Sequence, residues 1–166
     1  RKVIMQAPKN GFFYVIDRET GAFISAKNFV PVTWATHIDQ TTGRPVETEG
    51  ARYVGKTPEL QFPGPLGAHN WHPMSYSPDT GLVYIPAQEA PTVYRHKTDY
   101  KRTNGFWNTG TEFSDLPSDK ASFKALKAML KGRLLAWDPV IQKAVWSFEH
   151  DGPWNGGVLS TSGGLV

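Results

Sequence analysis

Two short stretches of the sequence hold the residues whose types could do chemistry. One is H-N-W-H at 69–72, where Asn70 offers two hydrogen-bond donors and an acceptor, and Trp71 offers an indole N–H on a flat apolar ring. The other is Lys9, which stands in the turn-forming sequence P-K-N-G. An ammonium group can stabilise developing negative charge, but most turn lysines are simply solvated. The residues alone leave both interpretations open for Lys9. They also allow an ordinary buried tryptophan beside a turn asparagine.

The two histidines of this stretch, His69 and His72, raise the question of a metal site. Zinc sites need three or four converging ligands, and an isolated H-x-x-H pair without cysteine or a helical setting is a weak signal. A third histidine, His37, lies upstream, and His96 and His150 belong to no pattern. We therefore expect hydrogen-bonded structural histidines and no metal ligand in this chain.

Short apolar runs separated by turn-forming residues occur along most of the chain, and this pattern predicts β-strands. We therefore expect strands to position these residues. The predicted strands are residues 12–16, 22–25, 29–34, 74–77, 82–86, 133–137 and 144–150. The sequences D-R-E-T-G at 17–21 and P-D-T-G at 78–81 are typical of hairpin turns. Residues 36–65 and 89–117 have little periodicity and are predicted to be irregular loops. Residues 119–131 are predicted to be helical, since apolar side chains recur every three or four residues.

A weak repeat runs through the predicted strands. Residues 13–25 and 134–146 share an apolar alternation, an aspartate at the same offset, a turn and a returning strand, while 77–86 shares only the turn and the return. Strand–turn–strand units that repeat without helices between them favour a β-propeller over a single sandwich. The predicted fold class is therefore all-β, with about three blades of a propeller.

Composition excludes several classes of protein. The 166 residues are 39% hydrophobic and 20% charged, which is ordinary for a globular domain. The net charge of +3 comes from scattered basic residues and is too weak a field to indicate a nucleic-acid partner. There is no cysteine, so this sequence holds no disulfide, cysteine-ligated zinc or c-type haem attachment motif. Because the chain begins at Arg1 and ends where a strand is predicted to start, at G-G-L-V, we expect a fragment of a longer protein.

The pattern A-x-D…K-x-x-W from Ala136 to Trp146 resembles the tryptophan docking motif of the pyrroloquinoline quinone (PQQ) alcohol dehydrogenases. In that family the tryptophan of each blade packs between neighbouring blades. Four longer segments resemble the quinoprotein ethanol dehydrogenases, especially the quinohaemoprotein type, in the family's own order. They are residues 8–35, 67–88, 132–150 and 153–166. By this resemblance we expect Trp137, Trp146 and Trp154 to pack between blades.

The resemblance implies an eight-bladed propeller, with residues 1–166 forming part of a single PQQ-binding domain. It implies oxidation of primary alcohols to aldehydes by hydride transfer to PQQ, which a Ca²⁺ ion activates. Lys9 would then reach the quinone oxygens, and Asn70 and Trp71 would also bind PQQ. The catalytic aspartate and the calcium ligands are expected upstream of residue 1. No catalytic residue and no metal ligand is therefore expected in this fragment.

The resemblance also implies the partners: a small alcohol as substrate and a cytochrome or other periplasmic electron acceptor. A c-type haem, where present, would lie on a C-terminal domain beyond residue 166, and membrane association is left open. We expect the lysine-rich helix at 119–131 to be a surface insertion with a solvated basic face. The main alternative is a non-enzymatic propeller scaffold of the envelope, with a sugar-binding propeller as a more distant one. A scaffold has no reason to retain both Lys9 and the pair Asn70 and Trp71.

Overall fold

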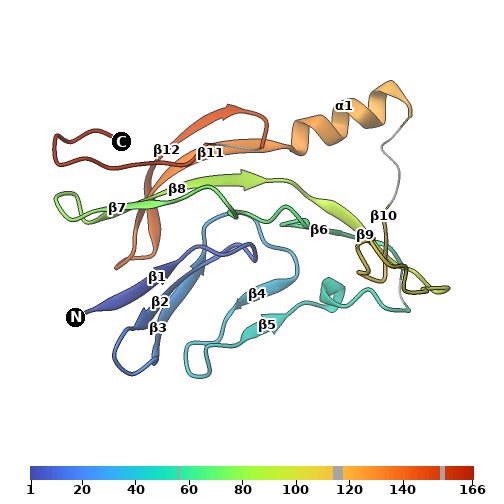
Figure 1. Cartoon of the computed structure of the whole chain (residues 1–166), viewed down its shortest axis with the longest axis horizontal. Helices are drawn as coiled ribbons and strands as arrows, with labels where there is room; N and C mark the ends of the chain where they lie inside the picture. The colour runs from blue at the N-terminus through green and yellow to red at the C-terminus, as the bar shows by residue number, and fades with distance from the viewer. Residues whose placement is uncertain (56, 114–117, 154–155) are drawn as a thin grey trace.

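The computed structural model describes residues 1–55, 57–113, 118–153 and 156–166, and within these ranges strands dominate. The first sheet is an antiparallel meander in the order β1-β2-β3, and the second has the order β12-β11-β8-β7. Their strands are β1 (Val3–Gln6), β2 (Phe12–Asp17), β3 (Phe23–Asn28), β7 (Ser75–Ser77), β8 (Leu82–Glu89), β11 (Lys131–Asp138) and β12 (Lys143–Asp151). The two sheets lie next to each other (Figure 1). The all-β prediction is confirmed.

The turn between β2 and β3 shows why the predicted hairpins form. The Asp17 carboxylate accepts hydrogen bonds from the backbone N–H groups of Glu19 and Thr20, both at 2.9 Å, and Gly21 has φ +72°. The bond from the Thr20 backbone, with the side-chain bond from Arg1, holds the pKa of Asp17 well below its ordinary value of 3.8. The ionised aspartate is therefore part of the turn.

The repeat at 77–86 is not a separate blade. Its strands β7 and β8 pair with each other, and β8 then pairs with β11 of the 134–146 repeat in the same four-stranded sheet. The described residues thus form one four-stranded and one three-stranded sheet of the repeating type. The number of blades stays a prediction; the structure shows only that the repeat units 77–86 and 134–146 share one sheet, a pairing that the long connection between β8 and β11 hides in the sequence.

The two segments predicted to be irregular contain short strands. A hairpin pairs β4 (Ala35–Ile38) with β5 (Pro45–Glu47), and a small sheet has the order β10-β9-β6. The remaining elements are η1 (Glu49–Ala51), β6 (Glu59–Gln61), β9 (Thr92–His96) and β10 (Thr111–Phe113). The predicted strand at 29–34 is wrong, since these residues form bends before β4. Pro31 in this segment cannot donate to a ladder, and the Trp34 indole instead donates to the Asn10 carbonyl at 3.0 Å.

The main core lies between the two sheets. Phe13 and Ile85 are fully buried there, with Val15, Leu135 and Trp137 around them. The rings of Phe13 and Trp137 have their centroids 5.9 Å apart. Each such side chain contributes about 1.5–3 kcal/mol by leaving water. β2 also buries its other face, where Phe12 packs in a second cluster with Ala26, Ala35 and Ile38.

The tryptophans of the docking motif differ in their surroundings. Trp137 is buried and packs against Phe13 of the neighbouring sheet, and its docking role stays a prediction. Trp146 is 43% exposed and packs on Tyr84 of its own sheet, with ring centroids 5.8 Å apart. Its docking role stays a prediction. Trp154 lies outside the described residues.

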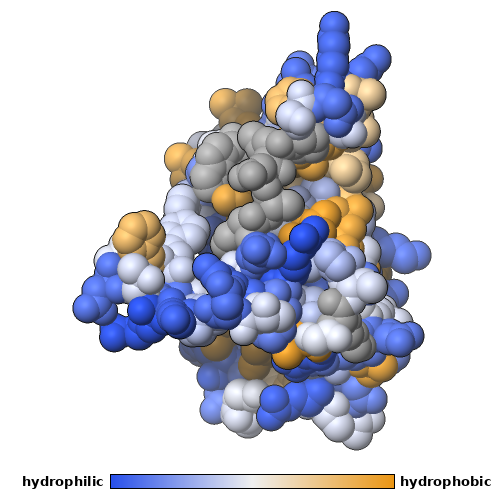
Figure 2. Space-filling model, turned by 90° about the vertical axis from the view of Figure 1, so that its right-hand side faces the viewer, coloured by the Kyte–Doolittle hydropathy of each residue, from blue (hydrophilic) through white to orange (hydrophobic). Residues whose placement is uncertain are grey.

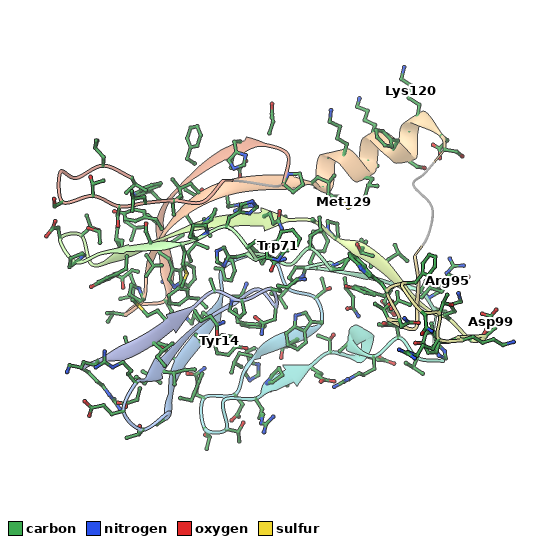
Figure 3. All side chains as sticks on the ribbon, viewed as in Figure 1. Tyr14, Trp71, Arg95, Asp99, Lys120 and Met129 are labelled. Carbon is green, nitrogen blue, oxygen red and sulfur yellow. The ribbon has the colours of Figure 1, made fainter. Side chains whose placement is uncertain are left out.

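The predicted helix is confirmed as α1 (Lys120–Met129), which Asp119 caps by accepting a hydrogen bond from the Ser122 N–H at 2.8 Å. None of its residues is buried, and Lys120 points away from the sheets (Figure 3). The end of the molecule that carries α1 is largely hydrophilic, with scattered hydrophobic groups (Figure 2). No helix within the described ranges is long and apolar enough to cross a membrane.

Candidate functional site

The turn after β1 lies directly against the segment that precedes β7. The Ala68 N–H donates to the Lys9 carbonyl at 3.0 Å, and the Gln88 N–H on β8 donates to the Ala68 carbonyl at 2.8 Å. The Gln88 side chain also donates to the Gly67 carbonyl at 3.0 Å. These bonds attach Lys9, through residues 67–68, to the end of the long strand β8.

Gly67 allows the close approach of these two segments. Its φ is +80°, and a Cβ atom at this position would lie 2.6 Å from the Lys9 Cβ and 2.8 Å from the Lys9 Cα. Real Cβ atoms do not come so near, so a side chain at Gly67 would displace the Lys9 backbone. The position of the Lys9 backbone therefore depends on glycine at residue 67.

The turn that carries Lys9 is also fixed from its other side. The Asn10 carboxamide oxygen accepts from the Phe12 N–H at 3.1 Å, and its amide donates to the Tyr14 hydroxyl at 2.9 Å. Burial raises the pKa of Tyr14, and the Asn10 hydrogen bond partly opposes this rise. Tyr14 is therefore a neutral hydroxyl that can accept from Asn10 at physiological pH.

His69 joins the same two segments. It is nearly buried, with its Nδ1 2.5 Å from the Ala7 carbonyl oxygen and its Nε2 2.7 Å from the His72 carbonyl oxygen. The prediction of a hydrogen-bonded structural histidine is confirmed for His69. In the part of the chain that the structure describes, no three histidine, aspartate or glutamate side chains converge as a metal site would require.

A hollow of about 230 Å³ opens where these segments meet. It is lined by Gln6, Ala7, Pro8, Lys9, His69, Asn70 and Met74. Of the three predicted cofactor-binding residues, the structure brings together Lys9 and Asn70. Trp71 is next to Asn70 in the chain but is 76% exposed and is not among the lining residues. Figure 3 shows Trp71 near the centre of the view, between the β1-β2-β3 sheet and the sheet that contains β8.

Sequence reasoning missed the residues that support this hollow. Gly67 and Gln88 lie inside the 67–88 segment that carried the resemblance, but nothing in their types marks them as supports. Glu89, the next residue of β8, forms an ion pair with Arg133 of β11, and both side chains are largely buried. The ion pair between Glu89 and Arg133 fixes the end of β8, where Gln88 hydrogen-bonds to residues 67–68.

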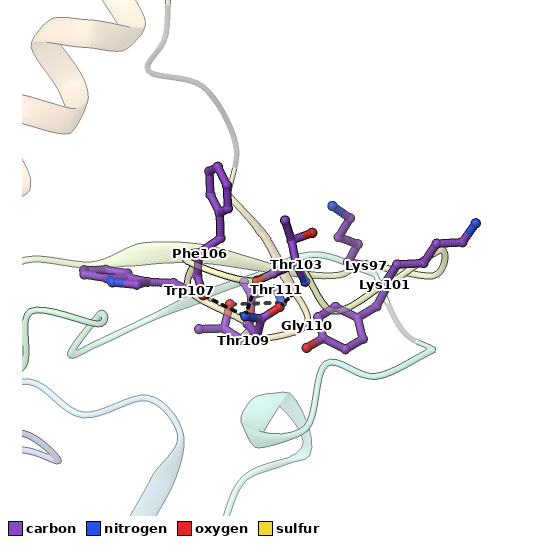
Figure 4. Close-up of a pocket in the computed structure, with 10 residues that line it drawn as sticks. Lys97, Lys101, Thr103, Phe106, Trp107, Thr109, Gly110 and Thr111 are labelled. Atoms are coloured by element: carbon purple, nitrogen blue, oxygen red, sulfur yellow. Dashed lines mark hydrogen bonds between the residues drawn. The ribbon is translucent and has the colours of Figure 1, made fainter.

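A second hollow, of about 320 Å³, lies in the loop between β9 and β10 (Figure 4). The Asn108 side chain closes this loop, since it accepts from the Thr103 N–H at 2.8 Å and donates to the carbonyls of Thr103 and Phe106 at 2.9 and 2.7 Å. Phe106 and Trp107 are 73% and 89% exposed and extend away from Lys97 and Lys101. None of the predicted cofactor-binding residues lines this hollow.

Comparison with known proteins gives a consistent result for the whole chain, although no family model matches it. The chain is 54% identical over 166 residues to the quinohemoprotein alcohol dehydrogenase ADH IIB of Pseudomonas putida, and 50% identical to the quinohemoprotein alcohol dehydrogenase of Comamonas testosteroni. It is 47% identical to the 1-butanol dehydrogenase (cytochrome c) of Thauera butanivorans. Each match covers the entire chain but only 23–24% of the relative.

Solved structures agree with these relatives. The chain matches quinohemoprotein alcohol dehydrogenase ADHIIG from Pseudomonas putida with a TM-score of 0.92 at 45% identity, and the Comamonas testosteroni enzyme with 0.84 at 50%. Both matches cover 98% of this chain and about a quarter of the solved chain. A europium-containing methanol dehydrogenase matches with a TM-score of 0.73 at 28% identity, over 91% of this chain and 25% of that one. Over its whole length the chain is therefore similar to a segment that makes up about a quarter of the quinohemoprotein alcohol dehydrogenases.

Proposed function

We propose that this chain forms one wall of the PQQ site in an enzyme that oxidises primary alcohols to aldehydes. The observation that carries the proposal is that Lys9 and Asn70, which are far apart in the chain, line the same hollow. The relatives are named as alcohol dehydrogenases, so the alternative of a scaffold propeller is not favoured.

The residues around the hollow suit a planar, anionic ligand. Lys9 supplies an ammonium group, Asn70 supplies an amide that both donates and accepts, and no acidic side chain is among the described residues that line it. Trp71 extends a flat aromatic surface and an indole N–H beside them. The side chains present therefore fit a quinone that carries carboxylates.

When bound, PQQ supplies the electron sink that accepts a hydride from the alcohol. The role of this chain is to bind and orient the quinone and to stabilise charge. The Lys9 ammonium would donate a hydrogen bond to an oxygen of the bound quinone and would stabilise negative charge there. Removing one such donor costs about 2.7–4 kcal/mol by analogy with oxyanion sites. Asn70 would bind the polar edge of the quinone, and Trp71 would offer a flat aromatic surface beside it.

Other properties of the complete protein are part of this proposal. A Ca²⁺ ion would activate PQQ through ligands and a catalytic aspartate that lie outside residues 1–166. A periplasmic location fits an enzyme of this kind. A cytochrome would serve as electron acceptor, as the printed name of the Thauera butanivorans relative indicates for that protein, and a c-type haem would lie on a further domain. An eight-bladed propeller with tryptophan docking would complete the two sheets described here.

The test is a PQQ titration of the complete apoenzyme, followed by assay of alcohol oxidation. We expect Lys9→Ala to lower kcat about 10²–10³-fold at saturating PQQ, because one donor to the developing charge is lost. Asn70→Ala and Trp71→Ala should instead raise the Kd for PQQ. Lys27→Ala is the matched control, since this lysine is exposed on β3, does not line the hollow and should change neither quantity. Unchanged turnover in Lys9→Ala, with PQQ still bound, would reject the role of Lys9.

A further inference from the structure

His69 is placed to control both segments of the proposed PQQ site. One ring nitrogen faces the carbonyl of Ala7, two residues before Lys9, and the other faces the carbonyl of His72, which closes the turn containing Asn70. The ring itself lines the hollow between them. A single side chain thus connects the backbone on either side of the two residues that would contact the ligand.

Both partners of the His69 ring are carbonyl oxygens, which can only accept hydrogen bonds. A neutral imidazole has one N–H donor and one bare nitrogen. In the neutral form, one bare nitrogen would face a carbonyl oxygen at 2.5 or 2.7 Å, with two lone pairs opposed. The doubly protonated ring donates at both sides, and such charge-assisted bonds are short and strong. The geometry therefore fits an imidazolium.

The surroundings of the ring allow this charge. Among the described residues, Lys9 is the other ionisable side chain that lines the hollow, and it is exposed, so water screens its ammonium group. His72, half-buried, contributes its carbonyl to the bond. The two hydrogen bonds to backbone carbonyls offset the cost of burying a cation.

We propose that His69 is a doubly protonated positioning residue that clamps the Lys9 turn to the Asn70 turn and places a fixed positive charge in the floor of the PQQ site. This inference rests on the proposed function for its ligand. The ring does not react, but it sets the separation of the two PQQ-binding segments and favours an anionic molecule between them.

The charge of His69 can be tested without activity. The complete apoenzyme, labelled with ¹⁵N in its histidine rings, is examined by long-range ¹H–¹⁵N correlation at about pH 8, where an ordinary imidazole is neutral. Disappearance of signals in His69→Gln assigns the ring. We expect both His69 nitrogens to show the shift of protonated nitrogen. A single neutral tautomer would overturn the proposal, and this result does not depend on whether PQQ binds.

The positioning role is tested on the same variant by PQQ titration. Both N–H donors of glutamine sit on one nitrogen, which cannot reach carbonyls that face the two separate ring nitrogens. We therefore expect the Kd for PQQ to rise about tenfold or more, as one charge-assisted bond is lost. At saturating PQQ, the KM for the alcohol should stay unchanged. His37→Gln is the control, because His37 is exposed on β4 and bonds the neighbouring Thr36 hydroxyl. An unchanged Kd in His69→Gln would overturn the positioning role. Failure of the unaltered enzyme to bind PQQ would instead refute the proposed function.

Discussion

Gly67→Ala should displace Lys9 without removing any polar group. The new Cβ would lie 2.6 Å from the Lys9 Cβ, 2.7 Å from its Cγ and 2.8 Å from its Cα. Carbon atoms in contact prefer about 3.5–4.0 Å, so the two segments must separate by roughly 1 Å. Rotation of the Lys9 side chain cannot relieve the contact, because the Cα and Cβ belong to the rigid part of the residue.

The cost of this displacement has two parts beyond the strain of a positive φ. Forcing an extra methyl into a packed contact costs about 1–3 kcal/mol. Stretching the 3.0 Å bond from the Ala68 N–H to the Lys9 carbonyl by about 1 Å removes a further 0.5–1.5 kcal/mol, roughly the worth of one hydrogen bond. We therefore expect Gly67→Ala to destabilise the protein by about 1.5–4.5 kcal/mol more than the same change at an open positive-φ glycine.

Gly81→Ala supplies that comparison. Gly81 has φ +70°, close to the φ of +80° at Gly67, but nothing lies within 4 Å of its added Cβ. Urea unfolding of the two variants in the complete enzyme therefore separates steric displacement from backbone strain. Because Lys9 moves by about 1 Å, kcat should also fall on the order of 10²-fold in Gly67→Ala alone.

The reasoning would be refuted if Gly67→Ala and Gly81→Ala lost equal stability and equal activity. Equal loss would mean that the turn at Lys9 yields without cost, so that Gly67 is present only for its backbone angle. A stability difference without an activity difference would show that Lys9 is displaced but does not act on the reaction.

Two further substitutions test the charges that support the fold. Arg133→Met should destabilise the protein by about 3–5 kcal/mol in urea unfolding, since it leaves the carboxylate of Glu89 buried without its cation, whereas Arg52→Met breaks an exposed pair and should cost about 1 kcal/mol or less. The folded state lowers the pKa of Asp17, so the ionised carboxylate stabilises the fold above about pH 3.8. This stabilisation is lost as the pH falls through the lowered pKa. Substitution of Asp17 should therefore remove this part of the pH dependence of stability. Thermal unfolding midpoints at a series of acid pH values should fall less steeply in Asp17→Asn, while the exposed control Glu19→Gln should follow the unaltered protein.

Local turn chemistry explains which elements could be predicted from the sequence. The Asp17 turn and the hairpin ending at Gly81 form from side chains within four residues, so their sequences are sufficient. Three-residue strands such as β5, β6 and β10 are too short for a period of two to be visible. The pairing of β8 with β11 joins distant segments, and no local pattern encodes it. For this reason the sequence does not reveal that the repeat units 77–86 and 134–146 share one sheet.

The candidate site likewise contains some residues that the sequence predicts and others that only the structure reveals. The resemblance supplied Lys9, Asn70 and Trp71, and the structure brings the first two to one hollow. The role of Gly67 depends on how near Lys9 comes, and the role of His69 depends on what faces each ring nitrogen. Neither is a property of residue type. A sequence can indicate a histidine that is hydrogen-bonded, but not that both of its partners are acceptors.

The backbone position of Lys9 is fixed by contacts with residues that are distant in the sequence. Its carbonyl accepts from Ala68, the carbonyl of the next residue accepts from the Trp34 indole, and the carbonyl of Gly11 accepts from the Phe29 N–H at 3.0 Å. Two separate segments, 29–34 and 67–68, thus hold three consecutive residues of one turn. A turn held this way has little freedom to rearrange when charge develops beside it, and such preorganisation is what makes one ammonium group effective. The lysine side chain is exposed and ordinary, but the backbone beneath it is fixed by residues 29, 34 and 68.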